Sequence, residues 1–194
     1  MIDVALVLNS IAALLVVISL TFEIPKELRE GVASTLLAKP LGRFQYLLGK
    51  MIGCMVTGAV ICALIAVGSF IVFNIAFGQR IDLAMFQSHL LLILALIPMS
   101  ALGVLFAVIL PEVIAPIITV VVVWFAFSTK CLANIWGVYG GLLPDLDLFN
   151  FKANAVYQVN IPWMYVLLVA VWGICYAAFA LSLASIVFER KDIK

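Results

Sequence analysis

Five long apolar stretches constrain this chain more than any other feature of its sequence. They run approximately over residues 4–22, 47–77, 88–110, 113–130 and 162–188. A helix needs about 20 apolar residues to cross a bilayer, and the stretches lack the alternation of membrane-barrel strands. Because backbone groups in lipid must bond within their own segment, each stretch is predicted to be a transmembrane helix.

The composition favours the same class. Hydrophobic residues make up 66% of the 194 residues, charged residues make up 11%, and the mean hydropathy is +1.28. A soluble domain is about half apolar and about a quarter charged. The net charge of +1, without a polybasic run, argues against a nucleic-acid partner. We therefore predict an all-α polytopic membrane protein, with one domain over residues 1–194 and about five transmembrane helices in a lipid bilayer.

A polar segment, residues 23–50, separates the first two apolar stretches. It holds eight charged side chains: Glu23, Lys26, Glu27, Arg29, Glu30, Lys39, Arg43 and Lys50. Because the flanking sequence is suited to lipid, this segment is the first place where a water-soluble partner is expected to bind.

Within residues 23–46 we predict a short amphipathic helix on the cytoplasmic face, bounded by Pro25 and Pro40. Proline suits the first turn of a helix and prevents its continuation at the other end. Glu27 and Glu30 favour the positive end of the helix dipole. The apolar side chains recur at helical spacing and form one stripe: Leu28, Val32, Leu36 and Leu37. Such a helix either rests on lipid or docks a cytoplasmic protein, and the periodicity leaves both possibilities open.

The basic residues are distributed unequally between the two sides that five spans define. One side carries Lys26, Arg29, Lys39, Arg43, Lys50, Arg190, Lys191 and Lys194. The other carries Arg80, Lys130 and Lys152. The positive-inside rule places the first side in the cytoplasm. We therefore predict a multi-pass protein of the cell (inner) membrane, with its N-terminus outside and its C-terminus in the cytoplasm.

The remaining candidate sites favour structural interpretations. Residues 131–161 are predicted to form an external loop, in which Asp145 and Asp147 belong to a solvated turn. The four cysteines form no CxxC pair and are expected to pack as small hydrophobic residues. The single histidine, His89, excludes a paired-histidine metalloprotease and is expected at headgroup level. The chain has no GxxxxGK[ST] phosphate loop. We predict no metal or cofactor and no enzymatic activity, and the substrate-binding residues stay unassigned.

The run EGVASTLLAKPLGR, residues 30–43, followed by Leu48-Gly49-Lys50, resembles the coupling segment of export-class (type-2) ABC-transporter permeases. The matching positions are Glu30, Gly31, Leu36, Leu37, Pro40, Arg43, Gly49 and Lys50. Val32 replaces the threonine usual in that family, and Ala38 replaces a serine. The ending Phe188-Glu189-Arg190-Lys191-Asp192 and the Leu143-Pro144…Phe149-Asn150 segment are similar to the subgroup linked to multicopper-enzyme maturation.

The resemblance implies a permease subunit of an ATP-driven exporter. Its partners would be cytoplasmic ABC ATPase subunits and a second permease chain, identical or different. The implied ATPase-coupling residues are Glu27, Leu28, Glu30, Gly31, Val32, Leu36, Leu37, Pro40, Arg43 and Lys50. Permeases of this family carry six spans with the coupling segment after the second, whereas here it follows the first. We therefore expect a leading span to be missing or supplied by another chain. A non-transporting membrane anchor or assembly subunit of a larger complex is the alternative.

Overall fold

The computed structural model describes residues 2–31, 42–78, 82–128 and 144–190. The helices follow the order α1 (Ile2–Arg29), α3 (Arg43–Phe77), α4 (Leu83–Ile109), α5 (Ile114–Ala126), the short 3-10 helix η1 (Leu146–Phe149), α7 (Lys152–Val156) and α8 (Trp163–Glu189). No strand occurs within the described ranges. The predicted class, an all-α polytopic membrane protein, is confirmed.

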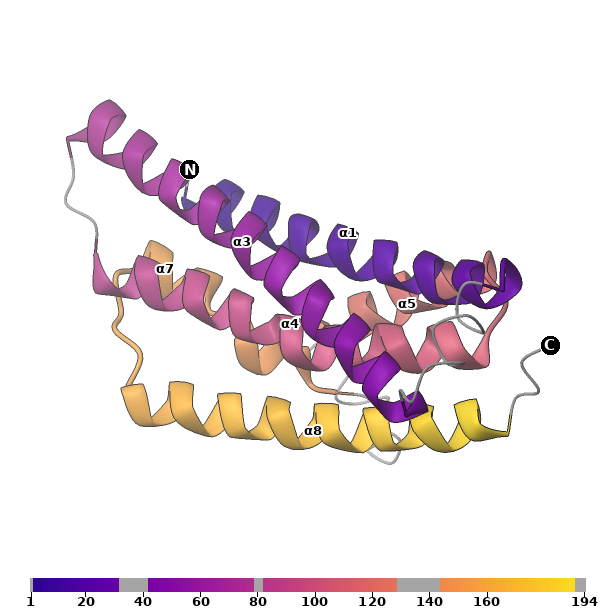
Figure 1. The fold of residues 1–194 in the computed structure, drawn as a ribbon. Helices are drawn as coiled ribbons and strands as arrows, with labels where there is room; N and C mark the ends of the chain where they lie inside the picture. Colours follow the sequence, from indigo (N-terminus) through magenta and orange to yellow (C-terminus); the bar gives the residue numbers. More distant parts are fainter. Residues whose placement is uncertain (1, 32–41, 79–81, 129–143, 191–194) are drawn as a thin grey trace.

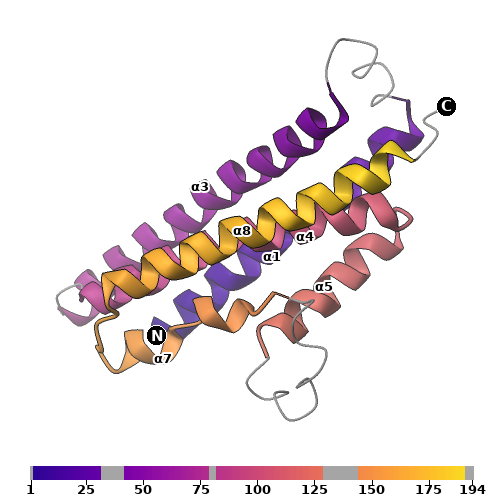
Figure 2. The ribbon, with the colours of Figure 1, turned by 90° about the horizontal axis from the view of Figure 1, so that it is seen from below.

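α4 lies at the centre of the bundle. It contacts α1, α3, α5, η1, α7 and α8, and most of its residues are buried. α1 and α3 lie along one side of it and α8 along the other (Figures 1 and 2). The long helices run side by side, so the bundle has two ends, and each end gathers the termini of several helices.

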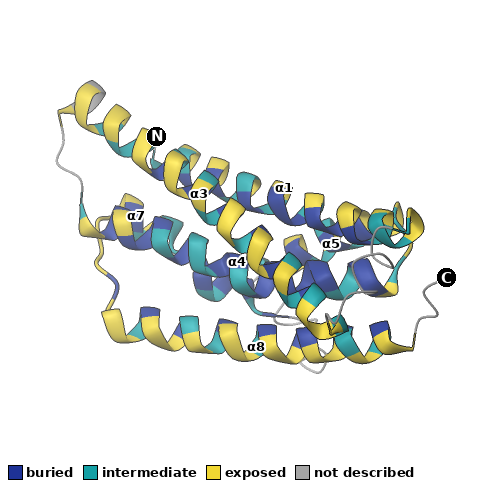
Figure 3. Ribbon diagram, in the orientation of Figure 1, coloured by how far each residue is buried: buried dark blue, intermediate teal, exposed yellow. Residues whose placement is uncertain are grey.

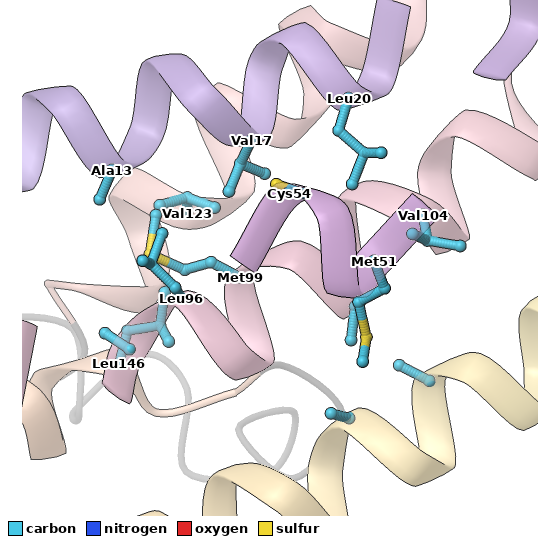
Figure 4. Packing of buried hydrophobic residues seen from close by; sticks show 14 of the residues in the cluster. Ala13, Val17, Leu20, Met51, Cys54, Leu96, Met99, Val104, Val123 and Leu146 are labelled. Atoms are coloured by element: carbon cyan, nitrogen blue, oxygen red, sulfur yellow. The ribbon is translucent and has the colours of Figure 1, made fainter. Parts of the chain in front are cut away.

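Two glycines allow the neighbouring helices to approach α4 closely. A Cβ on Gly58 of α3 would lie 2.9 Å from Cδ1 of Leu96, and a Cβ on Gly103 of α4 would lie 2.9 Å from Cγ1 of Val17. Both distances are shorter than a van der Waals contact, so a larger residue would push the helices apart. Figure 4 shows Val17 and Leu96 among the packed side chains of this core.

The outward faces of the bundle are exposed (Figure 3), and many of the side chains there are large and apolar. Exposed side chains include Val56, Val60 and Leu64 on α3, Ile117, Val121 and Trp124 on α5, and Leu167, Val171 and Ile174 on α8. Exposed apolar patches of this extent are not stable in water. They are the surface that a bilayer covers, and the protein is membrane-embedded.

Four of the five predicted spans correspond to helices long and apolar enough to cross a bilayer, namely α1, α3, α4 and α8. The fifth, predicted at 113–130, differs. α5 has 13 residues, and at about 1.5 Å per residue it covers about 20 Å of a hydrocarbon layer about 30 Å thick. The turn around Pro111 delays its start to Ile114, and its C-cap is Phe127. By itself α5 is too short for a span.

The predicted helix start at Pro25 is wrong, because α1 continues through this proline to Arg29. A proline inside a helix costs about 3 kcal/mol, so tertiary contacts must offset it. Ile24 is fully buried in the core, and one turn later Glu27 binds two side chains of α3. The beginning of the predicted coupling helix is therefore the last part of α1.

Residues 144–161 are the described part of the predicted external loop, 131–161, which the aromatic-rich sequence predicts to be partly re-entrant or surface-lying. Of its described part, η1 packs into the bundle. Phe149 is fully buried, and its ring lies beside Gly173 of α8, where a Cβ would be 3.3 Å from Phe149 Cζ. Asp147 is 6% exposed and accepts a hydrogen bond from Asn150 Nδ2, so the expectation of a solvated turn is wrong for this carboxylate.

Candidate functional site

Charged side chains gather where α1 and α8 end and α3 begins, at the right of Figure 1. We call this the charged end of the bundle: residues 23–29 of α1 with the following turn 30–31, 43–50 of α3 with its N-cap Gly42, the 110–113 turn between α4 and α5, and 187–189 of α8 with its C-cap Arg190. It carries the polar segment that the sequence predicts as the coupling site. Three groups of contacts hold it together.

Arg43 joins the start of α3 to the end of α8. Its Nη1 donates hydrogen bonds to the backbone carbonyls of Phe188 and Glu189, both at 2.9 Å. The last carbonyls of a helix have no partner within the helix and carry its negative dipole end, so a guanidinium is well suited to cap them. The guanidinium carbon also lies 5.8 Å from the centre of the Phe188 ring, and Tyr46 stacks on that ring at 6.0 Å between centroids.

Lys50 joins α3 to α1. Its Nζ donates hydrogen bonds to Glu27 Oε1 and, at 3.3 Å, to Glu23 Oε2. The second oxygen of Glu27 accepts a hydrogen bond from the Tyr46 hydroxyl at 2.7 Å. Glu27 and Lys50 are about three-quarters covered, whereas Glu23 is 59% exposed. This cluster of Glu23, Glu27 and Lys50 thus contains two carboxylates and one ammonium.

Arg29 joins α1 to the turn between α4 and α5. Its Nη1 lies 2.7 Å from Glu112 Oε2, with side-chain exposures of 67% and 25%. A pair so accessible to water contributes little to stability, about 0–1 kcal/mol. It nevertheless places the end of α1 beside a third element of the charged end. The apolar side chains next to it, Leu28 and Leu110, line a groove of about 390 Å³.

The structure brings together three of the predicted coupling residues, Glu27, Arg43 and Lys50. Leu28 packs half-buried against the core, and Glu30 is exposed. Gly31 has φ 74°, the left-handed conformation that commonly ends a helix and that other residues rarely adopt. Val32, Leu36, Leu37 and Pro40 lie outside the described residues.

Five partners at this end were not predicted as coupling residues: Glu23, Tyr46, Glu112, Phe188 and Glu189. Each lies on a different helix or turn from the group it contacts, and the Arg43–Phe188 bond joins residues 145 positions apart. Periodicity reports which residues share a face of one helix, so it carries no signal for contacts between helices. The number of predicted spans indicates that residues 23–50 and the C-terminal segment lie on the same side of the membrane, but it does not indicate which of their residues are in contact.

The opposite end of the bundle is held by neutral groups. Gln87 Nε2 donates to the Ile161 carbonyl at 2.8 Å, and Gln87 Oε1 accepts from the Ile161 N–H at 2.9 Å. Ser88 donates to the carbonyl of Phe151 at 3.1 Å. At the same end, in α7, burial lowers the pKa of Lys152 below its ordinary value, and the nearby Asp3 carboxylate partly opposes this change.

His89, next to Gln87 and Ser88 near the start of α4, is 2% exposed and therefore faces the interior of the bundle. Its Nδ1 lies 2.9 Å from the Met85 carbonyl and its Nε2 lies 3.4 Å from Ser69 Oγ. These contacts are part of the packing between α3 and α4.

The described part of the chain contains no group of three or more His, Cys, Asp or Glu side chains arranged to hold a metal ion. No family model matches the chain, and no curated protein matches it. The charged end consists of ion pairs that connect α1 to α3 and to the α4–α5 turn, and of the Arg43 cap that connects α3 to α8.

Proposed function

We propose that this chain is the membrane-spanning permease subunit of an ATP-driven ABC exporter, and that its charged end couples a separate cytoplasmic ATPase to rearrangement of the bundle. One observation carries the proposal. The connection between α1 and α3 is flanked on both sides by residues tied to other elements: Arg29 to the α4–α5 turn, Glu27 to α3, and Arg43 to α8. A partner that moves this connection therefore moves four parts of the bundle together.

The sequence supports the assignment of ATP hydrolysis to a partner subunit and of the membrane-spanning part to this chain. The chain lacks a phosphate loop, so ATP hydrolysis belongs to the partner. The resemblance of residues 30–50 to a permease coupling segment supplies the class of that partner. In this proposal the charged end faces the cytoplasm, the N-terminus lies outside the inner membrane, and a second permease chain completes the translocation path.

Docking is tested by Leu36→Asp, which places a charge in the middle of the predicted apolar stripe. Central anchors of an interface carry most of its affinity, and burying an unpaired charge is costly. We expect recovery of the ATPase in a pull-down to fall about tenfold or more, which corresponds to about 1.4 kcal/mol. The matched control is Val159→Asp, which makes the same chemical change at an exposed residue of the opposite end and should leave recovery unchanged.

Correct folding of both variants is checked by their thermal unfolding in detergent, and their insertion is checked by cysteine labelling in membranes. Normal recovery of the ATPase by a correctly inserted Leu36→Asp variant would remove the docking role. Recovery of other membrane proteins without any ATPase would instead favour an anchor or assembly subunit.

The orientation is tested by cysteine labelling in a background that lacks the four native cysteines. Lys26→Cys, at the charged end, should react with a membrane-impermeant reagent only after the cytoplasmic face is opened. Val159→Cys, at the opposite end, should react in intact cells. The reversed pattern would invert the proposed topology.

A further inference from the structure

A groove of about 550 Å³ lies between α1 and α3 beside the charged end. Its walls are successive turns of the two helices: Val16, Ser19, Leu20 and Glu23 from α1, and Gln45, Tyr46, Gly49, Lys50, Gly53, Cys54 and Thr57 from α3. The volume lies within the range of small-molecule sites, about 300–1,000 Å³. The groove is therefore large enough to hold a ligand of substantial size.

Two glycines make the groove wide. A Cβ added to Gly49 or to Gly53 would meet no atom within 4 Å. By contrast, Gly58 and Gly103 are required by close helix packing, since a Cβ there would clash. Glycine inside a helix costs about 0.5–1 kcal/mol relative to alanine, and nothing within the described chain compensates for Gly49 and Gly53. The space that they leave is available to another molecule.

The groove is polar at one end and apolar at the other. Lys50 and Glu23, which form an ion pair at 3.3 Å, stand at the polar end. Leu20, Cys54 and Val16 are each less than one-tenth exposed and form the apolar floor. The polar end coincides with the limit of the apolar stretches in the sequence. A molecule that fits this gradient has a charged headgroup and a hydrocarbon chain.

The charges specify the headgroup further. Two of the three N–H groups of the Lys50 ammonium point at Glu23 and Glu27, which leaves one donor for an anionic oxygen of a ligand. Glu23 accepts the Lys50 hydrogen bond through Oε2 and is 59% exposed. Glu23 therefore offers a partly exposed carboxylate to a cationic ligand group, directly beside the Lys50 ammonium, which offers a donor to an anionic one. A headgroup with an ammonium and a phosphate is complementary to this arrangement.

We propose that this groove binds a phospholipid whose headgroup carries a primary ammonium. The ammonium donates to the Glu23 carboxylate, the phosphate accepts from Lys50, and one acyl chain lies over Gly49, Gly53 and Leu20. A primary ammonium has three N–H donors and a quaternary choline has none, so the site distinguishes the two headgroups although both are zwitterionic. The bound lipid would fill the space between α1 and α3 next to the coupling residues.

The test compares phosphatidylethanolamine with phosphatidylcholine of identical acyl chains. The full chain is purified in mild detergent, each lipid is titrated, and binding is followed by native mass spectrometry and by the unfolding temperature. We expect phosphatidylethanolamine to bind about tenfold more tightly and to raise the unfolding temperature more, because one charge-assisted hydrogen bond accounts for about that factor. Equal binding of the two lipids would overturn the proposal.

Three variants assign the effect to the groove. Glu23→Gln should reduce the preference between the two lipids to about twofold or less, because the headgroup partner loses its charge. Gly53→Leu should abolish binding of both lipids by filling the groove. Gly68→Leu is the matched control, since a Cβ on this α3 glycine also meets no atom within 4 Å but lies outside the groove, and it should leave binding unchanged.

Two further outcomes would also overturn the proposal. One is an unchanged lipid preference in Glu23→Gln. The other is that the chain forms a dimer, that Gly53→Leu abolishes this dimer, and that the variant keeps the lipid preference. A helix of a second copy would then be the occupant of the groove.

Discussion

The two ends of the bundle are held together by different chemistry. At the charged end, α1, α3 and α8 are joined by Arg43, Lys50 and their acceptors, and several of these groups are accessible to water. At the opposite end, neutral side chains bond to buried backbone groups, as Gln87 does to Ile161. The ends are separated by the full length of the bundle (Figure 1).

The difference indicates which end is able to move. Breaking a buried neutral hydrogen bond leaves donors and acceptors without water, at a cost of about 1–3 kcal/mol for each group. Exposed ion pairs exchange their partners with water and contribute about 0–1 kcal/mol. The opposite end is thus expected to stay fixed, whereas the more exposed contacts of the charged end, Arg29–Glu112 and Lys50–Glu23, are able to rearrange at low cost. This asymmetry suits a subunit that is driven from one side.

The largest expected effect is at the fixed end. Gln87→Leu removes both hydrogen bonds to Ile161 and leaves a buried N–H and a buried carbonyl without these partners. We expect the free energy of unfolding to fall by about 2–4 kcal/mol, measured by denaturant unfolding in detergent. Val159→Leu, in the same connection but at an exposed position, is the control. A stability equal to that of the unaltered chain would show that the opposite end is not held by this pair.

An intermediate effect is expected at the charged end. Arg43→Gln loses the cap on α8 and the contact with Phe188, which should lower stability by about 1–2 kcal/mol while strongly reducing stimulation of the partner ATPase. Arg43→Lys should restore little, since an ammonium does not reproduce the fork of donors that the guanidinium offers. Arg190→Gln, at an exposed residue of the same end, should change neither quantity. Full ATPase stimulation in Arg43→Gln would separate this cap from coupling.

The smallest effect has the opposite sign. Asn9 of α1 is fully buried, and neither polar atom of its amide has a hydrogen-bond partner among the described residues. Leucine has the same number of side-chain heavy atoms, so Asn9→Leu should raise the unfolding free energy by about 1 kcal/mol. Thr119→Val, which removes a hydroxyl bonded to the Ala115 carbonyl, is expected to be neutral or slightly destabilising. A decrease in stability for Asn9→Leu would indicate that the amide has a polar partner in the membrane.

The class of the fold was predictable because it depends on composition and on the length of apolar stretches. Both are properties of the chain itself, and they predicted α3, α4 and α8 closely. Pro25 by itself predicts the start of a new helix. Instead α1 continues through it, because Ile24 is buried in the core and Glu27 contacts α3. Local rules fail where tertiary contacts outweigh them.

The candidate site was predictable in part. Glu27, Arg43 and Lys50 were selected from one segment, and the structure gives each a partner on another helix. The acceptors of Arg43 were not predictable, because Phe188 and Glu189 accept through backbone carbonyls, whose position depends on where α8 ends. The burial of Phe149 also depends on a space beside Gly173 that no periodicity reports.

The central claim is that the charged end couples this chain to an ATPase. The most direct measurement is purification of the tagged chain from native membranes in mild detergent, followed by identification of the bound proteins and an assay of ATP hydrolysis. We expect a nucleotide-binding ABC subunit in near-stoichiometric amount and ATP hydrolysis by the purified complex. Recovery of the intact chain without such a subunit and without ATP hydrolysis would contradict the account.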